Sequence, residues 1–569
     1  MTQRPPDLLY AVDERPPWPK LVLLGLQFSL LLVVPLVLLV IVLKAAQTPT
    51  DDAHSYLSFG LLALALGTIF QAYNGRWFGS GYLAPPVFSA IYIGPALLAA
   101  QAGGMPAVAA MTIFAGLVEM TLARLLPYLR LLFQPLIGGL IVLVVGIELG
   151  LIGLDHLTDV RDGNVPDYGL HLAVAALCLA TAIGLSVWGR GVFRLMCSLF
   201  ALIVGVIAAL AVGLIAGPEI NQLSAAAWFA LPDFGVLAYD FDPALLPSFL
   251  VAAVAAAVRV TGVIASAQRI NDAKWKRPEP KSLQRGMFAD GMGAAAAGLL
   301  GVLGTSAAPS IVGLSMVTGA TSRAIAYAAA IFLIVFALTP KVAAFMIGLP
   351  PEVFGALILF NGSLMIVSGF QILAPRGLTT RTGFVLSLSL LLGLLARTEP
   401  QVFATLPEAL RLVTGSLLTV ALTTAIVLSL VFRLGIRRRE TEQWRGKDGE
   451  PVNFETMLRT RSHDWKVDDE TIDRAEAALT DVIRHIQESG YLDQPISLDA
   501  AFDELELEIE IAYRGRPIHP ARTVPMAHHV VHEESAAAGM SAAALAAEAD
   551  RTSVTMAGDE VRIKLWFTA

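Results

Sequence analysis

The sequence is poor in charged residues and in cysteine for its length. Only 15% of its 569 residues are charged, and only two are cysteines. A soluble chain of this size needs more polar surface than this composition supplies. Cys178 and Cys197 both fall inside apolar runs, so a disulfide framework is not expected. The net charge of −7 is mostly that of the C-terminal region and indicates no nucleic-acid partner.

The sequence is instead rich in long apolar runs. Hydrophobic residues make up 55% of the chain and the mean hydropathy is +0.65. A helix needs about 20 residues to cross the hydrocarbon of a bilayer. We expect fourteen membrane segments, at 19–44, 55–74, 80–101, 104–127, 132–154, 168–189, 194–217, 243–268, 286–304, 306–321, 323–340, 342–373, 378–396 and 407–433. The twelfth should bend at its two prolines, and the third and tenth are too interrupted for simple spans.

Basic residues alternate between the loops that join these segments. Loops after even-numbered segments hold fourteen lysines and arginines, whereas loops after odd-numbered segments hold four. Cytoplasmic loops of membrane proteins carry an excess of these residues. The N-terminus, the even loops and the basic tail after the last segment are therefore predicted to be cytoplasmic.

Arg259 is a cation in the middle of an apolar run. The run spans 245–264, and no other charge stands between Asp242 and Arg269. A charge at membrane depth costs at least about 2.5 kcal/mol and usually faces a cavity, an ion or a partner. We therefore predict a functional site at Arg259, and the structural alternative is a pair with a buried carboxylate.

The composition changes sharply after Arg439. Alternating runs at 505–513 and 561–567 are typical of strands with one solvent-exposed face. The range 468–489 is typical of an amphipathic helix, whose apolar side carries Ile472, Ala475, Leu479, Ile483 and Ile486. Residues 523–550 could form a helix or a loop. We predict a cytosolic α+β domain over 440–569, large enough for a modest core.

The predicted helix of this C-terminal domain resembles the ATP-binding fold of histidine kinases and anti-sigma factors. Asp481 stands where that fold has a magnesium-binding asparagine, and no Asp-x-Gly-x-Gly follows. We therefore predict a non-catalytic regulatory or assembly domain, with a cytosolic protein as its partner.

Short motifs along the membrane part carry a second resemblance. In chain order they include Leu24-Gly-Leu-Gln, Gly116-Leu-Val-Glu, Gln134-Pro-Leu-Ile-Gly-Gly, Gly146-Ile-Glu-Leu, Met287-Phe-Ala-Asp-Gly and Thr318-Gly319. Their order and spacing resemble the uracil/xanthine permeases, the nucleobase–ascorbate transporter family, over 21–434. The domains are then a tail at 1–18, a transporter domain at 19–434 and a regulatory domain at 440–569.

The resemblance implies an all-α polytopic fold of fourteen segments, arranged as two inverted repeats of seven with core and gate domains. It also implies a homodimer and an elevator mechanism. Segments 3 and 10 would be broken helices that meet at the middle of the membrane. The Pro-interrupted starts at 81–88 and 305–310 agree with this. Matched breaks in two repeats indicate a transport site, because the starts of half-helices present free N–H groups.

The resemblance also places individual site residues. With Gly262 as the reference, Arg259 stands where relatives carry a base-reading glutamate. Counted back from Gly313, Ser310 and Ile311 fall where relatives carry a Gln or Glu and an Asn that bind substrate. A nucleobase needs paired donors and acceptors, so ordinary uracil or xanthine uptake is not expected here.

The altered site favours an anion. Arg259, the half-helix starts and the hydroxyls of Ser306 and Ser310 would form an anion-attracting pocket. Related folds, the sulfate and bicarbonate carriers, place a positive site at the same crossing. Phe88 or Tyr92 could stack on a planar ligand, which suggests an anionic heterocycle such as urate.

Three further charges fall inside the membrane segments. Asp290 matches the family's Ala-Asp-Gly and is expected to order the core. Glu119 and Glu148 are candidates for the counter-ion of Arg259 or for a proton relay.

The function predicted is a secondary transporter in the inner (plasma) membrane that carries a small nucleobase-like or anionic solute with a proton or sodium ion. The alternatives are a carrier of inorganic or organic anions, and a membrane sensor that signals through the C-terminal domain. No catalytic constellation, metal site or cofactor motif is visible, so an enzyme is not expected.

Overall fold

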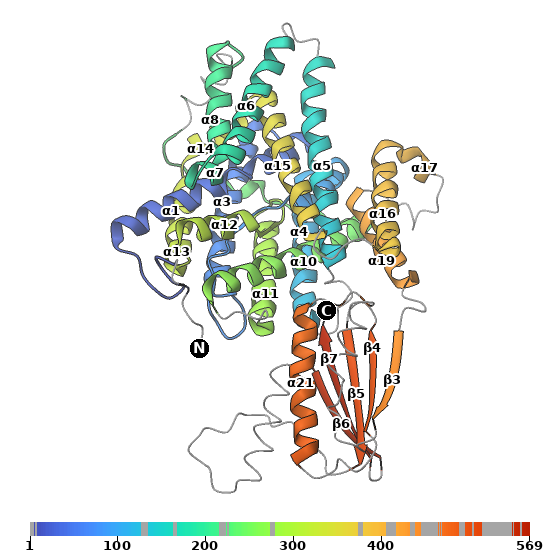
Figure 1. The fold of residues 1–569 in the computed structure, drawn as a ribbon. Helices are drawn as coiled ribbons and strands as arrows, with labels where there is room; N and C mark the ends of the chain where they lie inside the picture. The colour runs from blue at the N-terminus through green and yellow to red at the C-terminus, as the bar shows by residue number, and fades with distance from the viewer. Residues whose placement is uncertain are drawn as a thin grey trace. The chain divides into compact units, whose positions relative to one another are not determined.

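The computed structural model describes most of the chain. The described ranges are 8–126, 135–162, 168–215, 227–273, 279–373, 379–404, 417–432, 438–444, 469–488, 496–502, 506–514, 551–557 and 560–568, with single residues at 5, 224, 465, 467 and 549. The chain divides into two units, Met1–Ser429 and Leu430–Ala569, whose elements are labelled in Figure 1.

The first unit is built almost entirely of helices. They are α1 (Trp18–Val33), α2 (Leu36–Ala45), α3 (Thr50–Ala72), α4 (Ile93–Leu125), α5 (Pro135–Asp162), α6 (Tyr168–Trp188), α7 (Val192–Leu195), α8 (Cys197–Ala211), α10 (Leu246–Asn271), α11 (Pro280–Leu299), α12 (Pro309–Thr318), α13 (Arg323–Ala337), α14 (Pro340–Ile347), α15 (Pro351–Leu373), α16 (Thr380–Thr398), α17 (Pro400–Ala404) and α19 (Leu417–Phe432). Within the described ranges, eight helical spans are long and apolar enough to cross a membrane, with α1 and α2 together counted as one. A ninth span results if α13 and α14, which meet at 77°, are taken together. The predicted polytopic helical membrane fold is confirmed.

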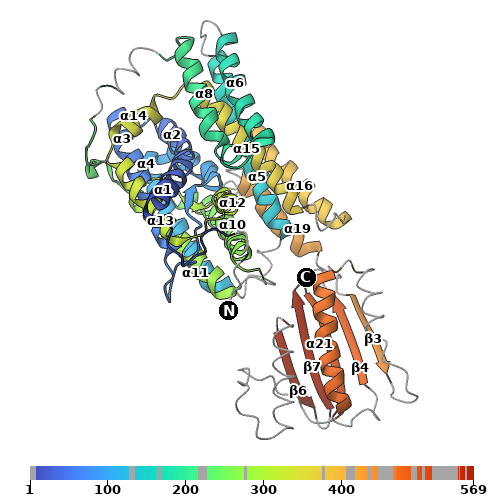
Figure 2. The ribbon, with the colours of Figure 1, turned by 60° about the vertical axis from the view of Figure 1, so that its left-hand side comes forward.

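Two groups of helices can be followed by their contacts. In the α4 group, α4 packs on α10 and α11, and α3 and α13 pack beside them with α1. In the α5 group, α5 packs on α15 and α16, and α6 and α8 pack against α15 (Figure 2). Glycines allow the closest crossings, because a Cβ at Gly291 would lie 2.8 Å from the backbone of α4, and one at Gly362 2.7 Å from that of α5.

Two short strands interrupt the helices near Arg259. Strand β1 (Pro86–Phe88) pairs antiparallel with β2 (Thr305–Ala307), and Val87 lies opposite Ser306. A single 3-10 turn, η1 (Ala90–Tyr92), leads from β1 into α4, and β2 leads into α12. The breaks predicted at 81–88 and 305–310 coincide with these strands. Two half-helices therefore begin on either side of one strand pair.

At several prolines and glycines, the helix ends in the structure differ from the predicted segment ends. The first predicted segment is two helices, α1 and α2, which are joined at Val34 and Pro35. The twelfth was predicted as one bent helix over 342–373, but α14 and α15 are separate, since the rings of Pro350 and Pro351 prevent a continuous hydrogen-bond ladder. The break predicted between segments 3 and 4 is present inside α4, where Gly104 has φ +67°. The start of the fourteenth segment, 407–416, lies outside the described residues.

The second unit combines one helix with one antiparallel sheet. The helix is α21 (Asp469–Glu488), and the sheet has the order β3-β4-β5-β7-β6. Its strands are β3 (Arg438–Trp444), β4 (Ile496–Phe502), β5 (Glu506–Arg514), β6 (Arg551–Ala557) and β7 (Glu560–Thr568). The strands predicted at 505–513 and 561–567 correspond to β5 and β7. Most of the predicted segment 523–550 lies outside the described residues.

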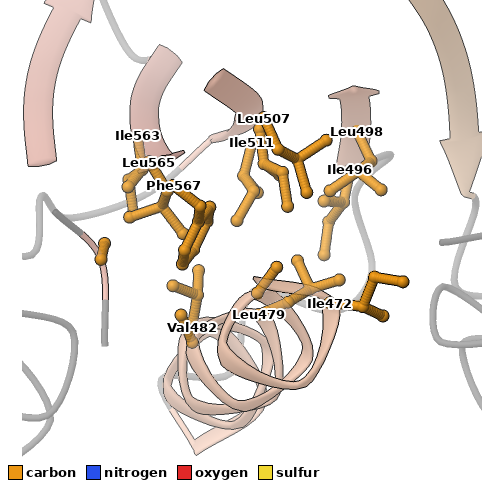
Figure 3. Packing of buried hydrophobic residues seen from close by; sticks show 14 of the residues in the cluster. Ile472, Leu479, Val482, Ile496, Leu498, Leu507, Ile511, Ile563, Leu565 and Phe567 are labelled. Carbon is orange, nitrogen blue, oxygen red and sulfur yellow. The ribbon is translucent and has the colours of Figure 1, made fainter. Parts of the chain in front are cut away.

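The core of the second unit lies between α21 and the sheet. Figure 3 shows Leu479 and Val482 of α21 facing Leu507, Ile563 and Phe567 of the sheet. The apolar stripe predicted on this helix included Ile483 but not Val482. Val482 is the fully buried residue of the two, and Ile483 packs at the edge of the core.

Candidate functional site

Asp290 joins three elements of the α4 group around the strand pair. It is buried on α11, and its carboxylate accepts hydrogen bonds from the Ser306 hydroxyl at 2.8 Å and from the Ala307 N–H at 2.9 Å. The side-chain amide of Gln71 on α3 donates to the same carboxylate at 3.3 Å, and to the carbonyl of Gly286 at 3.0 Å. A buried carboxylate with several donors is well compensated. Asp290 therefore fixes β2 against α3 and α11.

Arg259 lies at the centre of α10 and reaches the segment that follows β1. Its Nη1 donates to the Ser89 hydroxyl oxygen at 2.9 Å, and that oxygen also accepts from the N–H of Ile91 at 3.3 Å. Within the described part of the chain, this is the one hydrogen bond of the guanidinium. Arg259 is half-buried, and the charge of Asp290 acts on it without an ion-pair contact. Since a guanidinium has five N–H donors, most of them remain for a ligand.

The other predicted polar site residues have different surroundings. The hydroxyl of Ser306 is buried and donates to Asp290, so it is engaged in holding β2. Ile311 is fully buried in the first turn of α12. Ser310 precedes it in the same turn, and its side chain lies outside what the structure describes. Among the members of this set whose side chains the structure describes, Arg259 has donors without a described partner.

The two aromatic candidates are packed inside the α4 group. Phe88 and Tyr92 are both fully buried. The ring of Phe88 lies against Gly60 of α3, and the ring of Tyr92 lies against Gly304 just before β2, where an added Cβ would meet it at 2.6 Å. In this conformation neither ring is available to stack on a solute.

The two glutamates lie on opposite helix groups. Glu119 on α4 is fully buried, and its carboxyl group interacts with that of Asp290 through both charge and a side-chain hydrogen bond. Glu148 comes from α5, and its carboxylate lies against Gly94 at the start of α4. Asp290 is thus the carboxylate whose charge acts on Arg259. Glu148 instead lies against Gly94, five residues beyond Ser89, to which Arg259 donates its hydrogen bond.

Three residues of the site were not predicted from the sequence. Ser89 had a detectable signal, because a serine before a helical turn is a common N-cap. Gln71 and Gly94 had none, since their roles depend on Asp290 and Glu148, which are far away in the chain. The roles of Gln71 and Gly94 are visible only in the tertiary packing.

Comparisons with known proteins agree on one kind of protein. A family model described as the permease family, with the label Xan_ur_permease, matches residues 19–402. The xanthine permease XanP of Escherichia coli (strain K12) is 24% identical over 440 residues, which cover 75% of this chain and 95% of XanP. The uric acid permease PucJ of Bacillus subtilis (strain 168) is 26% identical over 443 residues, which cover 74% of this chain and 95% of PucJ.

A solved structure shares the fold at much lower identity. The murine anion transporter Slc26a9 in its inward-facing state superposes with a TM-score of 0.51 at 13% identity. The match covers 77% of this chain and 72% of that one. At this identity the likeness concerns the arrangement of the helices and not the solute.

Proposed function

Because the chain belongs to the xanthine/uracil permease family of membrane transporters, we propose that it carries an anionic or weakly acidic planar solute, of which urate is the model. The family consists of transporters and not of enzymes, as the sequence predicted. The solute class is inferred from the site, and the name of the Bacillus subtilis relative, a uric acid permease, is consistent with it.

The guanidinium of Arg259, which makes one hydrogen bond among the described residues, carries this proposal. It stands at the centre of a membrane helix, beside a strand pair from which two half-helices begin, and it uses one hydrogen bond to Ser89. A guanidinium presents a planar fork that matches the delocalised charge of a carboxylate or a urate-like ring. Half-helix starts add positive potential at the same place. A neutral nucleobase carries no negative charge for the guanidinium or for the positive half-helix starts to stabilise.

The transport cycle follows from the two helix groups. We propose that the α4 group moves as the core against the α5 group as the gate, within fourteen segments arranged as two inverted repeats and in a homodimer. The alternation of basic loops supports cytoplasmic termini. A proton or a sodium ion would move with the solute. The protein would act in the plasma membrane.

A second candidate function is a membrane sensor. The unit Leu430–Ala569 lies beyond the family match, which ends at residue 402, and it has its own core between α21 and the sheet. Such a unit could pass a ligand signal to a cytosolic protein. A sensor would bind the solute without moving it.

Counterflow in proteoliposomes separates the two candidates. Vesicles with the purified full-length protein are loaded with unlabelled urate and diluted into radiolabelled urate, with uracil, xanthine and sulfate as parallel solutes. Transient accumulation of labelled urate is expected. Binding without accumulation would favour the sensor, and accumulation of sulfate alone would show an inorganic anion carrier.

A further inference from the structure

Glu148 occupies an unusual place for a buried carboxylate. Its side chain extends from α5 to the start of α4, where a Cβ on Gly94 would overlap its Oε1. Glycine at position 94 thus leaves the room that the carboxylate fills. The residue is 6% exposed, and its Oε2 is buried without a hydrogen-bond partner among the described residues.

This contact joins the two helix groups at the segment that Arg259 also contacts. Segment 89–94 begins at Ser89, whose hydroxyl accepts a hydrogen bond from Arg259 of α10, and ends at Gly94, against which the carboxylate of Glu148 of α5 lies. The turn between them, η1, contacts both α10 and α5. A cation from one group and an acid from the other therefore flank the same six residues, and a solute that binds Arg259 would share this region with Glu148.

The charged groups near Glu148 are largely engaged elsewhere. Arg397 of α16 acts on it electrostatically, but its Nη2 is paired with Asp155 at 2.5 Å. On the other helices that pack in this group, His171 of α6 and Glu352 of α15 face each other at 3.4 Å.

Two opposite effects act on the charge of Glu148. Burial disfavours the ionised carboxylate, whereas the positive start of the α4 half-helix favours it. An ionised Glu148 would repel an anion bound at Arg259, and a protonated one would not. The group is thus suited to exchange its proton when an anion arrives.

We propose that Glu148 carries the coupling proton: an anionic solute occupies the region beside segment 89–94 when Glu148 is protonated, so one proton and one anion cross together. This proposal rests on the proposed function. It assigns the proton as the coupling ion of transport and Glu148 as the residue that carries it. Asp290 does not take this role, because three donors already fix its carboxylate.

Equilibrium binding of radiolabelled urate to the purified full-length protein tests the proposal. The measurement covers two pH units in which urate stays a monoanion. For the wild type, the Kd should rise with pH toward about tenfold per unit, as expected when binding takes up one proton. Glu148→Gln should bind urate with the wild-type affinity of low pH throughout, without the slope. Glu352→Gln removes another buried acid of the same helix group and should keep the slope.

Infrared difference spectroscopy provides a readout that needs no solute. The wild type should show a protonated carboxyl band that titrates over this range and is missing from Glu148→Gln. If the band titrates but urate does not bind, the proposed solute is wrong while the proton site stands. If urate binds and Glu148→Gln keeps the wild-type slope, or if no band is lost in the variant, the assignment of Glu148 is overturned and the transport proposal is untouched.

Discussion

The two half-helices begin in contrasting surroundings. At the start of α12, Asp290 is buried and receives three hydrogen bonds, which hold β2 in place. At the start of α4, Arg259 has one hydrogen bond, and Glu148 lies against Gly94 with one oxygen unpartnered among the described residues. The same interruption of a membrane helix thus serves two purposes. The side with Asp290, whose hydrogen bonds are satisfied, positions the strand pair. The side with Arg259 and Glu148, whose polar atoms have fewer described partners, is available to bind the solute.

Removal of the Asp290 carboxylate should have the largest effect on the stability of the protein. Asp290→Ala leaves the Ser306 hydroxyl and the Ala307 N–H without their acceptor, while the Gln71 amide keeps its hydrogen bond to the carbonyl of Gly286. Each buried group left unpaired costs about 1–3 kcal/mol, so we expect a destabilisation of about 2 kcal/mol or more. The measurement is thermal unfolding of the detergent-solubilised protein, followed by size-exclusion chromatography. Asp240→Ala, at an exposed carboxylate, should melt like the wild type, and equal melting of both variants would contradict the role of Asp290.

A bulky side chain beside Asp290 should have the next largest effect. A Cβ at Gly291 would lie 2.8 Å from the carbonyl of Gly116 and from the N–H of Met120, so Gly291→Val must separate α11 from α4. Overpacking of this kind costs about 1–3 kcal/mol. The same melting assay applies. Gly383→Val is the matched control, since no described residue lies within 4 Å of a Cβ there, and a similar loss in the control would show that the crossing is not the cause.

Removal of the Ser89 hydroxyl should affect both binding and stability. Ser89→Ala frees Arg259 from its hydrogen bond, leaves the fork less oriented and removes the acceptor of the Ile91 N–H. One hydrogen bond contributes about 0.5–1.5 kcal/mol, so urate affinity should fall about 2- to 12-fold, and loss of the N-cap should lower the stability by about 0.5–2 kcal/mol. Ser315→Ala is the control, because among the described residues that hydroxyl donates only to the Ile311 carbonyl of its own helix. Unchanged affinity in Ser89→Ala would mean that Ser89 does not position the guanidinium.

The smallest effect is expected in the second unit, where charges lie on the wet face of the sheet. Lys564 contacts Glu510 at 3.0 Å and Glu508 at 3.4 Å, and the hydrogen bond to Glu510 raises the pKa of Lys564. Exposed pairs contribute at most about 1 kcal/mol. Lys564→Gln should therefore change the urea midpoint of the full-length protein only slightly. Leu479→Ala, in the core of the same unit, should lower it clearly, at a cost of about 2–5 kcal/mol. Equal shifts would contradict the assignment of the core.

Features that depend on local sequence could be predicted. The apolar runs gave the helices, and the prolines of 81–88 and 305–310 marked the two interruptions. In the second unit, the spacing of Ile472, Ala475 and Leu479 predicted the face of α21 that is buried. The importance of Arg259 was visible because a charge in an apolar run needs an explanation.

Features that depend on contacts between distant segments could not be predicted. Arg259 and Ser89 are 170 residues apart, and no pattern relates them. Phe88 and Tyr92 look like ligand contacts in the sequence, but glycines on other segments provide the space into which their rings pack. The place of Glu148 depends in the same way on the absence of a side chain at Gly94.

Binding of urate to an Arg259 variant tests the central claim most directly. Radiolabelled urate is titrated against purified wild type, Arg259→Gln and Arg269→Gln, where Arg269 is an exposed arginine of the same helix. Loss of a half-buried charged partner of a bound anion costs about 2–5 kcal/mol, so Arg259→Gln should weaken binding at least about thirtyfold, while Arg269→Gln should bind like the wild type. Equal affinity for urate in all three proteins would contradict the claim that Arg259 binds the solute.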